Sequence, residues 1–592
     1  MTTHSSTQES PIVLPDGTEF QIWQDETEYQ KVYYVDQQHP GAADDNPGTE
    51  EAPFLTIQRA AEVVEPAEKV LVKSGIYREW IQPGRGGTGA DGMISFEAAP
   101  GAEAIIRGSQ VLDARWTNSE EARSVSVWKA DLPETFFEGD HPFAVVNTTE
   151  EDFEIMRWAR GEYGRIPHTL PRAMVFQNGR RLTQLGTCDD LPRVAGAFWI
   201  DVAHHALHVN PFDRRNPNTV DMEATTRQYL FNPLVKGLGY IRIKGLTFEH
   251  AGNGFIRSGN GAVTTWGGNH WIIENNTVRH INAVAIEIGA FTDEGTESED
   301  REELEKKTGD HLVLGNHVYD CGTGGIQGTV VPRSLVADNH IHDCGWQEVQ
   351  SYLETAGIKI LLTLDTVVQC NHIHHCHAAP GIWIDFANRN SRVCRNLLHD
   401  IAAANGAIFF EASNVLNLID HNIIYNVEGG SGVYQRDCDG LLIAHNLIQN
   451  CAAAGVRMRK TQSRDRVGIC KHNRVVNNII TQCPVPFDYE VMENVSDYNI
   501  LSSMGEDFSL GDWQETGLDP HSRMVQLDMA IDPGGQRLSW SSQTDAVLTV
   551  PREELLSFDY FGRPYPGDEV PVGPFTEGWS PVGRRLRLTP SR

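Results

Sequence analysis

Polar and apolar residues recur at a regular spacing through the second half of the chain. Eight segments share one pattern: NTVRHI, NHVYDC, NHIHDC, NHIHHC, NLLHDI, NIIYNV, NLIQNC and NIITQC. They begin at Asn276, Asn316, Asn339, Asn371, Asn396, Asn422, Asn446 and Asn478. Where no insertion intervenes, successive asparagines stand about 25 residues apart, which is one coil of a parallel β-helix with three short strands per turn.

Two columns of this repeat have structural explanations. Five residues after each asparagine stands Ile281, Cys321, Cys344, Cys376, Ile401, Val427, Cys451 or Cys483, a column that we expect to point into the core. The asparagines themselves are expected to stack at a tight turn and to hydrogen-bond along the ladder. We therefore predict a right-handed parallel β-helix, an all-β solenoid, and assign no catalytic role to the asparagine column.

The repeat is interrupted between residues 117 and 228. Short alternating runs separated by turn residues predict an antiparallel β-sandwich inserted there. We expect an N-terminal extension over 1–30, first coils with a capping helix over 31–116, catalytic coils over 229–505, and coil closure and a tail over 506–592. Within the tail, residues 557–575 are predicted to close the last coil. The charged stretch 291–310 is either a solvated excursion or a lid.

Composition narrows the class of function. The chain has 592 residues and a formal charge of -31, which repels phosphate backbones and anionic membranes. We expect neither nucleic acid nor membrane as a partner. The N-terminal residues lack a basic start followed by an apolar run, so a cytoplasmic protein is expected. Ten cysteines without paired spacing are expected to be reduced, and the histidines of NHIHHCH (371–377) are predicted to be structural.

Chemistry is concentrated on strands that follow a glycine in successive coils, among them GIKIL, GIWID, GAIFFE and GVYQR. Their isoleucines and valines must face inward, so alternate residues face outward. One outward column reads Gln327, Lys359, Trp383, Phe409, Tyr434, Arg457, and the next reads Thr329, Leu361, Asp385, Glu411, Arg436, Arg459. Functional groups from distant parts of the sequence are thereby expected to meet on one face.

Asp385 and Glu411 occupy equivalent positions on adjacent strands, about 4.8 Å apart. Two like charges facing each other weaken a sheet, so selection for stability alone would avoid them. A retaining glycosidase requires such a pair, one carboxylate as nucleophile and one carboxyl as acid. Lys359 and Arg436 supply neighbouring cations. Trp383 and Phe409 offer a flat apolar surface for a sugar ring.

Three alternatives compete with this hypothesis. A calcium site would use the two carboxylates with further oxygen ligands, for which Glu354 is a candidate. A polysaccharide lyase would use Lys359 or an arginine as base and other cations to neutralise a uronate. The arginine candidates are Arg436, Arg457 and Arg459. A non-enzymatic adhesion or tail protein has the fold but no need for a facing carboxylate pair.

Several motifs together resemble glycoside hydrolase family 120. They are YREWIQP, VWKADLPETFF, YIRIKGLTFEHAG, ETAGIKI, GIWIDFANRNSRVCRN and AIFFEASNVLNLIDHNII, in order over residues 31–500. The resemblance implies retaining β-xylosidase activity on a β-helix interrupted by a β-sandwich. It also implies that Asp385 is the nucleophile, that Glu411 is the acid/base, and that Glu354 and Lys359 line the sugar subsite.

The sequence departs from that family pattern at two positions, with Leu353 in place of histidine and Phe386 in place of tryptophan. These departures concern the identity of the sugar more than the reaction. Gln327 and Arg436 complete the predicted substrate contacts. We expect an exo-acting, homo-oligomeric enzyme on short xylo-oligosaccharides that needs no cofactor.

Overall fold

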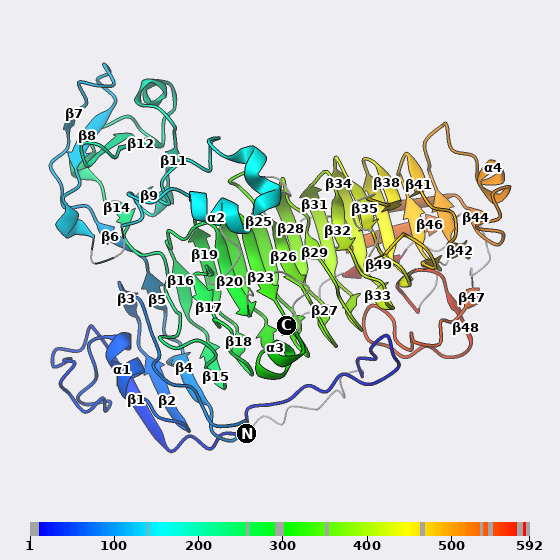
Figure 1. Cartoon of the computed structure of the whole chain (residues 1–592), viewed down its shortest axis with the longest axis horizontal. Coiled ribbons are helices and arrows are strands. Elements are labelled where there is room, and N and C mark those ends of the chain that lie inside the picture. The colour runs from blue at the N-terminus through cyan, green and yellow to red at the C-terminus, as the bar shows by residue number, and fades with distance from the viewer. Residues whose placement is uncertain are drawn as a thin grey trace.

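The computed structural model describes residues 11–137, 139, 141–255, 260–290, 301–349, 355–461, 468–532, 537–542, 549–576 and 584–587. Three parallel sheets wind together into a right-handed β-helix (Figure 1). A single apolar core runs along its axis from Tyr33 to Leu518. The predicted fold class is therefore confirmed.

The first sheet contains thirteen strands in coil order. They are β1 (Lys31–Val35), β2 (Glu68–Val72), β4 (Ile94–Ala98), β15 (Ile241–Lys244), β18 (Ile272–Glu274), β21 (Leu312–Leu314), β24 (Leu335–Ala337), β27 (Val367–Gln369), β30 (Arg392–Cys394), β33 (Asn417–Asp420), β36 (Leu441–Ala444), β39 (Arg474–Val476) and β42 (Val495–Asp497).

The second sheet also contains thirteen strands and carries the repeat segments that follow the asparagines. They are β3 (Gly75–Tyr77), β5 (Ala104–Arg107), β16 (Thr247–Glu249), β19 (Thr277–Ile281), β22 (His317–Cys321), β25 (His340–Cys344), β28 (His372–His377), β31 (Leu397–Ala402), β34 (Ile423–Glu428), β37 (Leu447–Cys451), β40 (Ile479–Thr481), β43 (Ile500–Ser502) and β44 (Arg523–Met524).

The third sheet carries the predicted site and contains nine strands. They are β17 (Val263–Thr264), β20 (Val284–Gly289), β23 (Gly324–Thr329), β26 (Ala356–Leu361), β29 (Ile382–Ile384), β32 (Gly406–Glu411), β35 (Ser431–Arg436), β38 (Ala454–Arg459) and β41 (Val485–Tyr489).

The asparagine ladder lies at the turn between the first and second sheets. The Asn396 side chain donates to Asn422 Oδ1 and to the carbonyl of Val368, both at 3.0 Å. Its Oδ1 accepts from the backbone and side-chain nitrogens of Asn371. The residue before each asparagine, such as Arg395 at φ 56°, adopts the left-handed conformation, whereas the asparagines do not. The ladder thus satisfies buried backbone groups at every coil.

We expect Asn396→Ala to lower the free energy of unfolding by about 3 kcal/mol, because it leaves buried donors of Asn371 without an acceptor. Urea unfolding followed by circular dichroism measures this change. The control is Asn118→Ala, an exposed asparagine, which should change stability by less than about 0.5 kcal/mol. If Asn396→Ala changed the free energy of unfolding as little as Asn118→Ala, the ladder would not be needed for stability.

The insertion begins at Gly108, earlier than the predicted boundary. Coils end with β5, and Ser109–Val111 (β6) already pairs with the inserted β14 (Met222–Thr225) instead of continuing the solenoid. A side chain at Gly108 would collide with the carbonyl of His250, so the chain can leave the coil there only through glycine.

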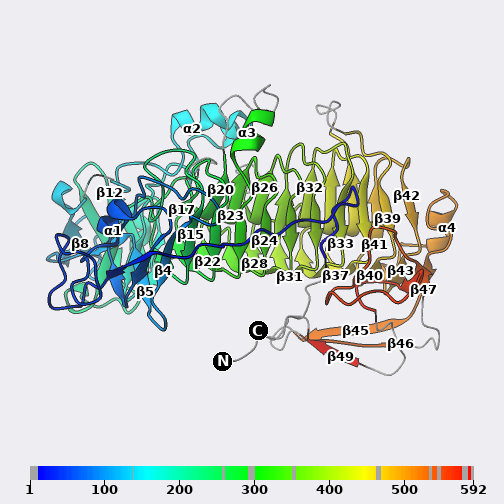
Figure 2. The ribbon, with the colours of Figure 1, turned by 90° about the horizontal axis from the view of Figure 1, so that it is seen from below.

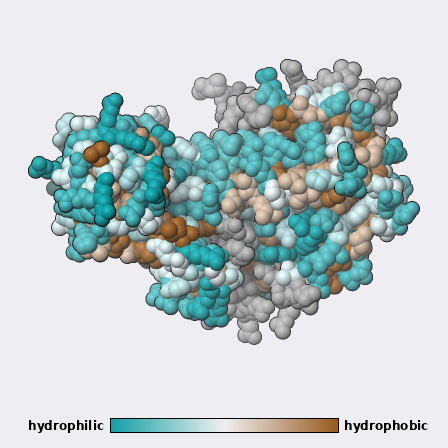
Figure 3. All heavy atoms as spheres, turned by 90° about the horizontal axis from the view of Figure 1, so that it is seen from above, coloured by the Kyte–Doolittle hydropathy of each residue, from teal (hydrophilic) through white to brown (hydrophobic). Residues whose placement is uncertain are grey.

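The inserted domain consists of two sheets packed around Trp116, Phe198 and other buried apolar residues. One sheet contains β6, β9 (Val175–Gln177), β10 (Arg180–Arg181) and β14, and the other contains β7 (Thr117–Asn118), β8 (Trp128–Asp131), β11 (Thr183–Gln184), β12 (Ala197–Asp201) and β13 (Ala206–Asn210). All pairs are antiparallel except β11 with β12. The domain forms a lobe at one end of the molecule (Figures 1 and 3).

Short helices cover both ends of the solenoid. Helix α1 (Ile57–Val63), capped by Thr56, packs its buried face on the first coils, as predicted. Leu510 and Trp513 of α4 (Leu510–Gln514) pack against the core at the last coils. Other helical segments are α2 (Glu150–Ile155), α3 (Arg301–Lys307), η1 (Glu134–Phe136), η2 (Arg157–Glu162), η3 (Cys188–Arg193) and η4 (Pro217–Thr219). No helix in the described ranges is long and apolar enough to cross a membrane.

The tail differs from the prediction that residues 557–575 close the last coil. Tyr560 and Phe575 instead pack on Leu397, Ile423 and Tyr425, along the outer face of the second sheet. They lie beside the antiparallel strands β45 (Leu527–Asp532), β46 (Arg537–Ser542) and β49 (Arg584–Arg587). Between β46 and β49 in the chain, β47 (Thr549–Pro551) pairs antiparallel with β48 (Glu569–Pro571). The reason is that aromatic side chains fit a sheet face with apolar residues.

The N-terminal extension and the cysteines complete the fold. Residues from Ile12 to Phe20 run along the outer face of the first sheet, where they pack on Leu312, Leu335 and Val367 (Figure 2). All ten cysteines are free thiols, and the column Cys321, Cys344, Cys376, Cys451 and Cys483 is buried in the core.

Candidate active site

The strand register of the third sheet aligns the predicted residues. Lys359 pairs with Trp383, and Trp383 pairs with Phe409. Ile384 pairs with Phe410, so Asp385 and Glu411, each one residue further along, stand side by side on consecutive coils. Because the side-chain period of a strand is two, a one-residue slip would have buried both carboxylates in the apolar core.

The carboxylates lie where the strands end in tight turns. Glu411 is followed by Ala412 at φ 49°, and Asp385 is followed two residues later by Ala387 at φ 56°. Leu362 and Asp437 adopt the same left-handed conformation on the neighbouring coils. Residues other than glycine rarely adopt this backbone conformation, so these turns store strain next to the carboxylate pair.

Each carboxylate has its own cation. Lys359 Nζ donates to Asp385 Oδ2 at 2.7 Å, and Asp385 Oδ1 accepts from the backbone nitrogen of Phe386 at 2.8 Å. Arg436 Nε donates to Glu411 Oε1 at 3.1 Å. Lys359 and Glu411 are each only 1% exposed and Asp385 is 7% exposed, so these ion pairs lie in a low-dielectric environment.

Electrostatics at Arg436 reflect the same pairing. Burial opposes the charged form of Arg436, but the attraction and hydrogen bond of Glu411 outweigh it and raise the pKa of the guanidinium. The Arg436 guanidinium therefore stays charged and in contact with Glu411.

Aromatic rings form the neighbouring column. Lys359 Nζ lies 3.8 Å from the centre of the Trp383 ring, Trp383 stacks on Phe409 at 4.9 Å, and Phe409 stacks on Tyr434 at 5.0 Å. In the part of the chain that the structure describes, no group accepts a hydrogen bond from the buried Trp383 Nε1. A polar donor at an apolar platform is suited to a sugar hydroxyl.

The sequence analysis missed two residues of this face. Tyr434 continues the aromatic stack, although its column position was known from the sequence. Glu287, 9% exposed, pairs with Gln327 at the other end of the same column and accepts from Thr264 Oγ1 at 2.9 Å. The segment VAIEIG could have revealed it, because it aligns with GGIQGT one coil later.

Two predicted features lie outside the described residues, namely Glu354 and the family departure at Leu353. The other departure, Phe386, packs beside Leu361, Leu362 and Leu304 of α3. Arg301 Nη2 donates to the carbonyl of Ala387, so the described part of the charged stretch is docked next to the turn after Asp385. Residues 291–300 lie outside the described part.

The cations at the site are paired in a way that disfavours the alternatives. Lys359 contacts Asp385 Oδ2 and Arg436 contacts Glu411 Oε1, so each carboxylate has an oxygen that a calcium ion would have to share with a cation of the protein. Arg457 and Arg459 both form ion pairs with Asp488. A lyase would need such cations to neutralise a uronate, and here all four already face carboxylates of the protein.

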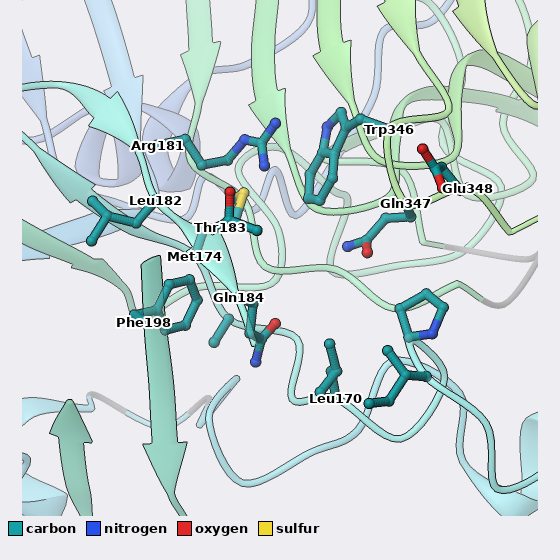
Figure 4. Close-up of a pocket in the computed structure, with 13 residues that line it drawn as sticks. Leu170, Met174, Arg181, Leu182, Thr183, Gln184, Phe198, Trp346, Gln347 and Glu348 are labelled. Atoms are coloured by element: carbon teal, nitrogen blue, oxygen red, sulfur yellow. The ribbon is translucent and has the colours of Figure 1, made fainter. Parts of the chain in front are cut away.

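A separate cavity of about 490 Å³ lies between the inserted domain and the loop after β25 (Figure 4). Its lining includes Arg181, Thr183 and Gln184 on one side and Trp346 with Gln347 on the other. Arg181 lies over the Trp346 ring at 3.6 Å and forms an ion pair with Asp320. None of the predicted site residues in the described ranges lines this cavity, so the cavity is separate from the site of the carboxylate pair.

Comparisons with known proteins agree with the fold. A family model described as a right handed beta helix region matches residues 260–430, which include Asp385 and Glu411. A structure of XylC in complex with xylose aligns over 94% of this chain and all of its own, with a TM-score of 0.71 and 20% identity. The chain shares the fold of XylC. The β-helix interrupted by a β-sandwich, which the resemblance to family 120 implied, is thereby confirmed.

Weaker similarity extends to two further solved structures. A GH136 lacto-N-biosidase from Eubacterium ramulus aligns over 80% of this chain and 67% of its own, with 15% identity and a TM-score of 0.41. The periplasmic alginate epimerase AlgG aligns over 45% and 69%, with 11% identity and a TM-score of 0.34. No curated protein sequence matches the chain.

Proposed function

We propose that the protein is a retaining glycoside hydrolase with Asp385 as nucleophile and Glu411 as acid/base. The observation that carries this proposal is the register that sets these two carboxylates on adjacent coils of one sheet. Adjacent strands lie about 4.8 Å apart. Retaining enzymes separate their carboxyl groups by about 5 to 5.5 Å, whereas inverting enzymes need about 6.5 to 9.5 Å to admit a water molecule.

The two cations fit the two roles differently. Lys359 keeps Asp385 ionised, as a nucleophile must be. Arg436 favours the ionised form of Glu411, which serves as the base when water attacks the glycosyl-enzyme. For the first step Glu411 must carry a proton, which the proposed mechanism requires it to take up before the glycosidic bond breaks.

The substrate is best sought among neutral sugars. The aromatic column of Trp383, Phe409 and Tyr434 offers stacking surface, and Trp383 Nε1 offers a donor. The acidic net charge disfavours polyanions. The family resemblance and the xylose complex of XylC make short β-linked xylo-oligosaccharides the first substrates to test. We propose exo-action by a cytoplasmic homo-oligomer.

Aryl glycosides of several sugars in both anomers identify the substrate, and proton NMR of the first sugar released decides the mechanism. Retention of the starting anomeric configuration is expected. An inverted first product would rule out the double displacement. Release of an unsaturated product absorbing in the ultraviolet would instead establish a lyase.

Lys359→Met is expected to lower kcat/KM about a hundredfold at neutral pH and to move its acidic limb to higher pH. The reason is that buried Asp385 loses the cation that stabilises its ionised form. The pH profile of kcat/KM on an activated aryl glycoside measures both effects. Lys306→Met, on an exposed face of α3, is the control and should leave the profile unchanged. An unshifted acidic limb in Lys359→Met would remove Lys359 from this role.

A further inference from the structure

Two columns of rings stand on the outer face of the second sheet, away from the carboxylate pair. The first column contains His317, His340 and His372, and the second contains Tyr319, His342, His374, His399 and Tyr425. Neighbouring rings in a column stack at 4.8 to 5.0 Å, except that Leu397 follows His372. The strands of these residues, including β22, β28 and β31, follow one another along one side of the solenoid (Figure 2).

The imidazoles of the two columns face each other through the same nitrogen. His317 Nε2 lies 2.9 Å from His342 Nε2, and His340 Nε2 lies 2.9 Å from His374 Nε2. His372 Nε2 lies 2.8 Å from His399 Nε2. Two sets of three have their ligand atoms within 4.8 Å of one another, namely His317, His340, His342 and His340, His372, His374.

A carboxylate behind His342 fixes which nitrogen of that ring is available. His342 Nδ1 lies 2.6 Å from Asp343 Oδ2, whereas His374 Nδ1 lies 2.6 Å from His375 Nδ1. When Nδ1–H donates to a carboxylate, neutral imidazole presents the Nε2 lone pair on its other side. This carboxylate–histidine arrangement is the one that orients histidine ligands in metal sites.

Beyond His372 the first column continues with aliphatic residues in place of histidine. From Leu397 onward the same position is Ile423, Leu447 and Ile479, and these residues pack under the C-terminal segment. The histidines occupy coils before that covered region and are half-buried, so an ion can reach them. Where residues of this column only pack against the C-terminal segment, they are aliphatic and not histidine.

We propose that this histidine ladder binds divalent transition-metal cations of the Zn²⁺ class. Imidazole nitrogen is a preferred ligand of Zn²⁺, Co²⁺, Ni²⁺ and Cu²⁺ and a poor one for Ca²⁺ or Mg²⁺. His340 belongs to both sets of three and is the central ligand. Each set takes its ligands from two strands, β22 with β25 or β25 with β28, so a bound ion joins two consecutive coils.

The test uses the untagged full-length chain after treatment with a chelator. Zn²⁺ is titrated by calorimetry, and Co²⁺ is added as a spectroscopic probe whose visible absorption reports nitrogen coordination. We expect at least one Zn²⁺ per chain, and at least tenfold weaker binding in His340→Gln. His204→Gln, which alters an exposed histidine of the inserted domain, is the matched control and should bind like the unmodified chain.

A second variant guards against a folding defect in His340→Gln. Asp343→Asn changes a half-exposed carboxylate that contacts the ladder only through a histidine, and it should weaken Zn²⁺ binding about tenfold or more. Zn²⁺ should also raise the Tm of the unmodified chain and of His204→Gln but not that of His340→Gln. Absence of Zn²⁺ binding, or equal binding in the unmodified chain, His340→Gln and Asp343→Asn, would overturn the proposal.

Discussion

Asp385→Asn is expected to lower kcat by about four orders of magnitude or more on every glycoside that the enzyme accepts. The amide retains the size of the side chain and an acceptor for Lys359 but cannot attack the anomeric carbon, so no glycosyl-enzyme forms. Because the defect lies in bond formation, an activated leaving group should not restore the rate. Steady-state kinetics with aryl glycosides of differing leaving-group acidity measure this.

The control for Asp385→Asn is Asp365→Asn, which makes the same chemical change in the turn after β26. It should retain activity within about twofold. Intact mass spectrometry with a slow fluorinated substrate adds an independent readout, in which a covalent adduct appears on the control but not on Asp385→Asn. An adduct on Asp385→Asn would show that another residue is the nucleophile.

Glu411→Ala is expected to behave differently from Asp385→Asn. Hydrolysis of substrates with poor leaving groups should fall by about 10² to 10⁴, because no group protonates the departing oxygen. Substrates with acidic phenols need little protonation, so they should give a rapid burst of phenol, after which the glycosyl-enzyme stalls for lack of a base. Rapid-mixing kinetics resolve the burst from the slow turnover.

Azide tests the same assignment chemically. A small anion can enter the space left by the Glu411 side chain and needs no base, so it should restore turnover and give a glycosyl azide with the starting anomeric configuration. Glu428→Ala, an exposed carboxylate at the end of β34, is the control and should show neither burst nor rescue. Loss of activity in Glu411→Ala with no burst and no azide rescue would remove the acid/base role.

The alignment of the site could be predicted from the sequence because two periods determine it. Alternation along a strand fixes which side chains point outward, and the coil length fixes which of them become neighbours. These two periods therefore predicted that Asp385 and Glu411 lie side by side. They also predicted a cation beside each carboxylate, Lys359 beside Asp385 and Arg436 beside Glu411.

Other features depend on contacts between distant parts of the chain, which no regular spacing in the sequence reveals. Residues 557–575 pack on a sheet face because Tyr560 and Phe575 meet apolar residues more than a hundred positions earlier in the chain. The exit from the solenoid at Gly108 depends on the closeness of the His250 carbonyl, which the local pattern does not reveal. The histidines of β28 were assigned a structural role from their alternation along the strand, and their contacts with His340 of β25 and His399 of β31 join different coils, which the local pattern does not reveal.

The N-terminal segment has a consequence for the order of events during synthesis. Val13 accepts a hydrogen bond from Arg392, and Asp16 is bound by Asn390, so this segment docks on coils made almost 380 residues later. At about 5 to 20 residues per second, the ribosome delivers those coils roughly 20 to 80 s after the segment has been made. Earlier coils can stack as they emerge, because each contacts mainly its neighbours. This segment is thus translated long before the coils on which it docks, and it can fasten the solenoid only after most of the face that carries Asp385 has been made.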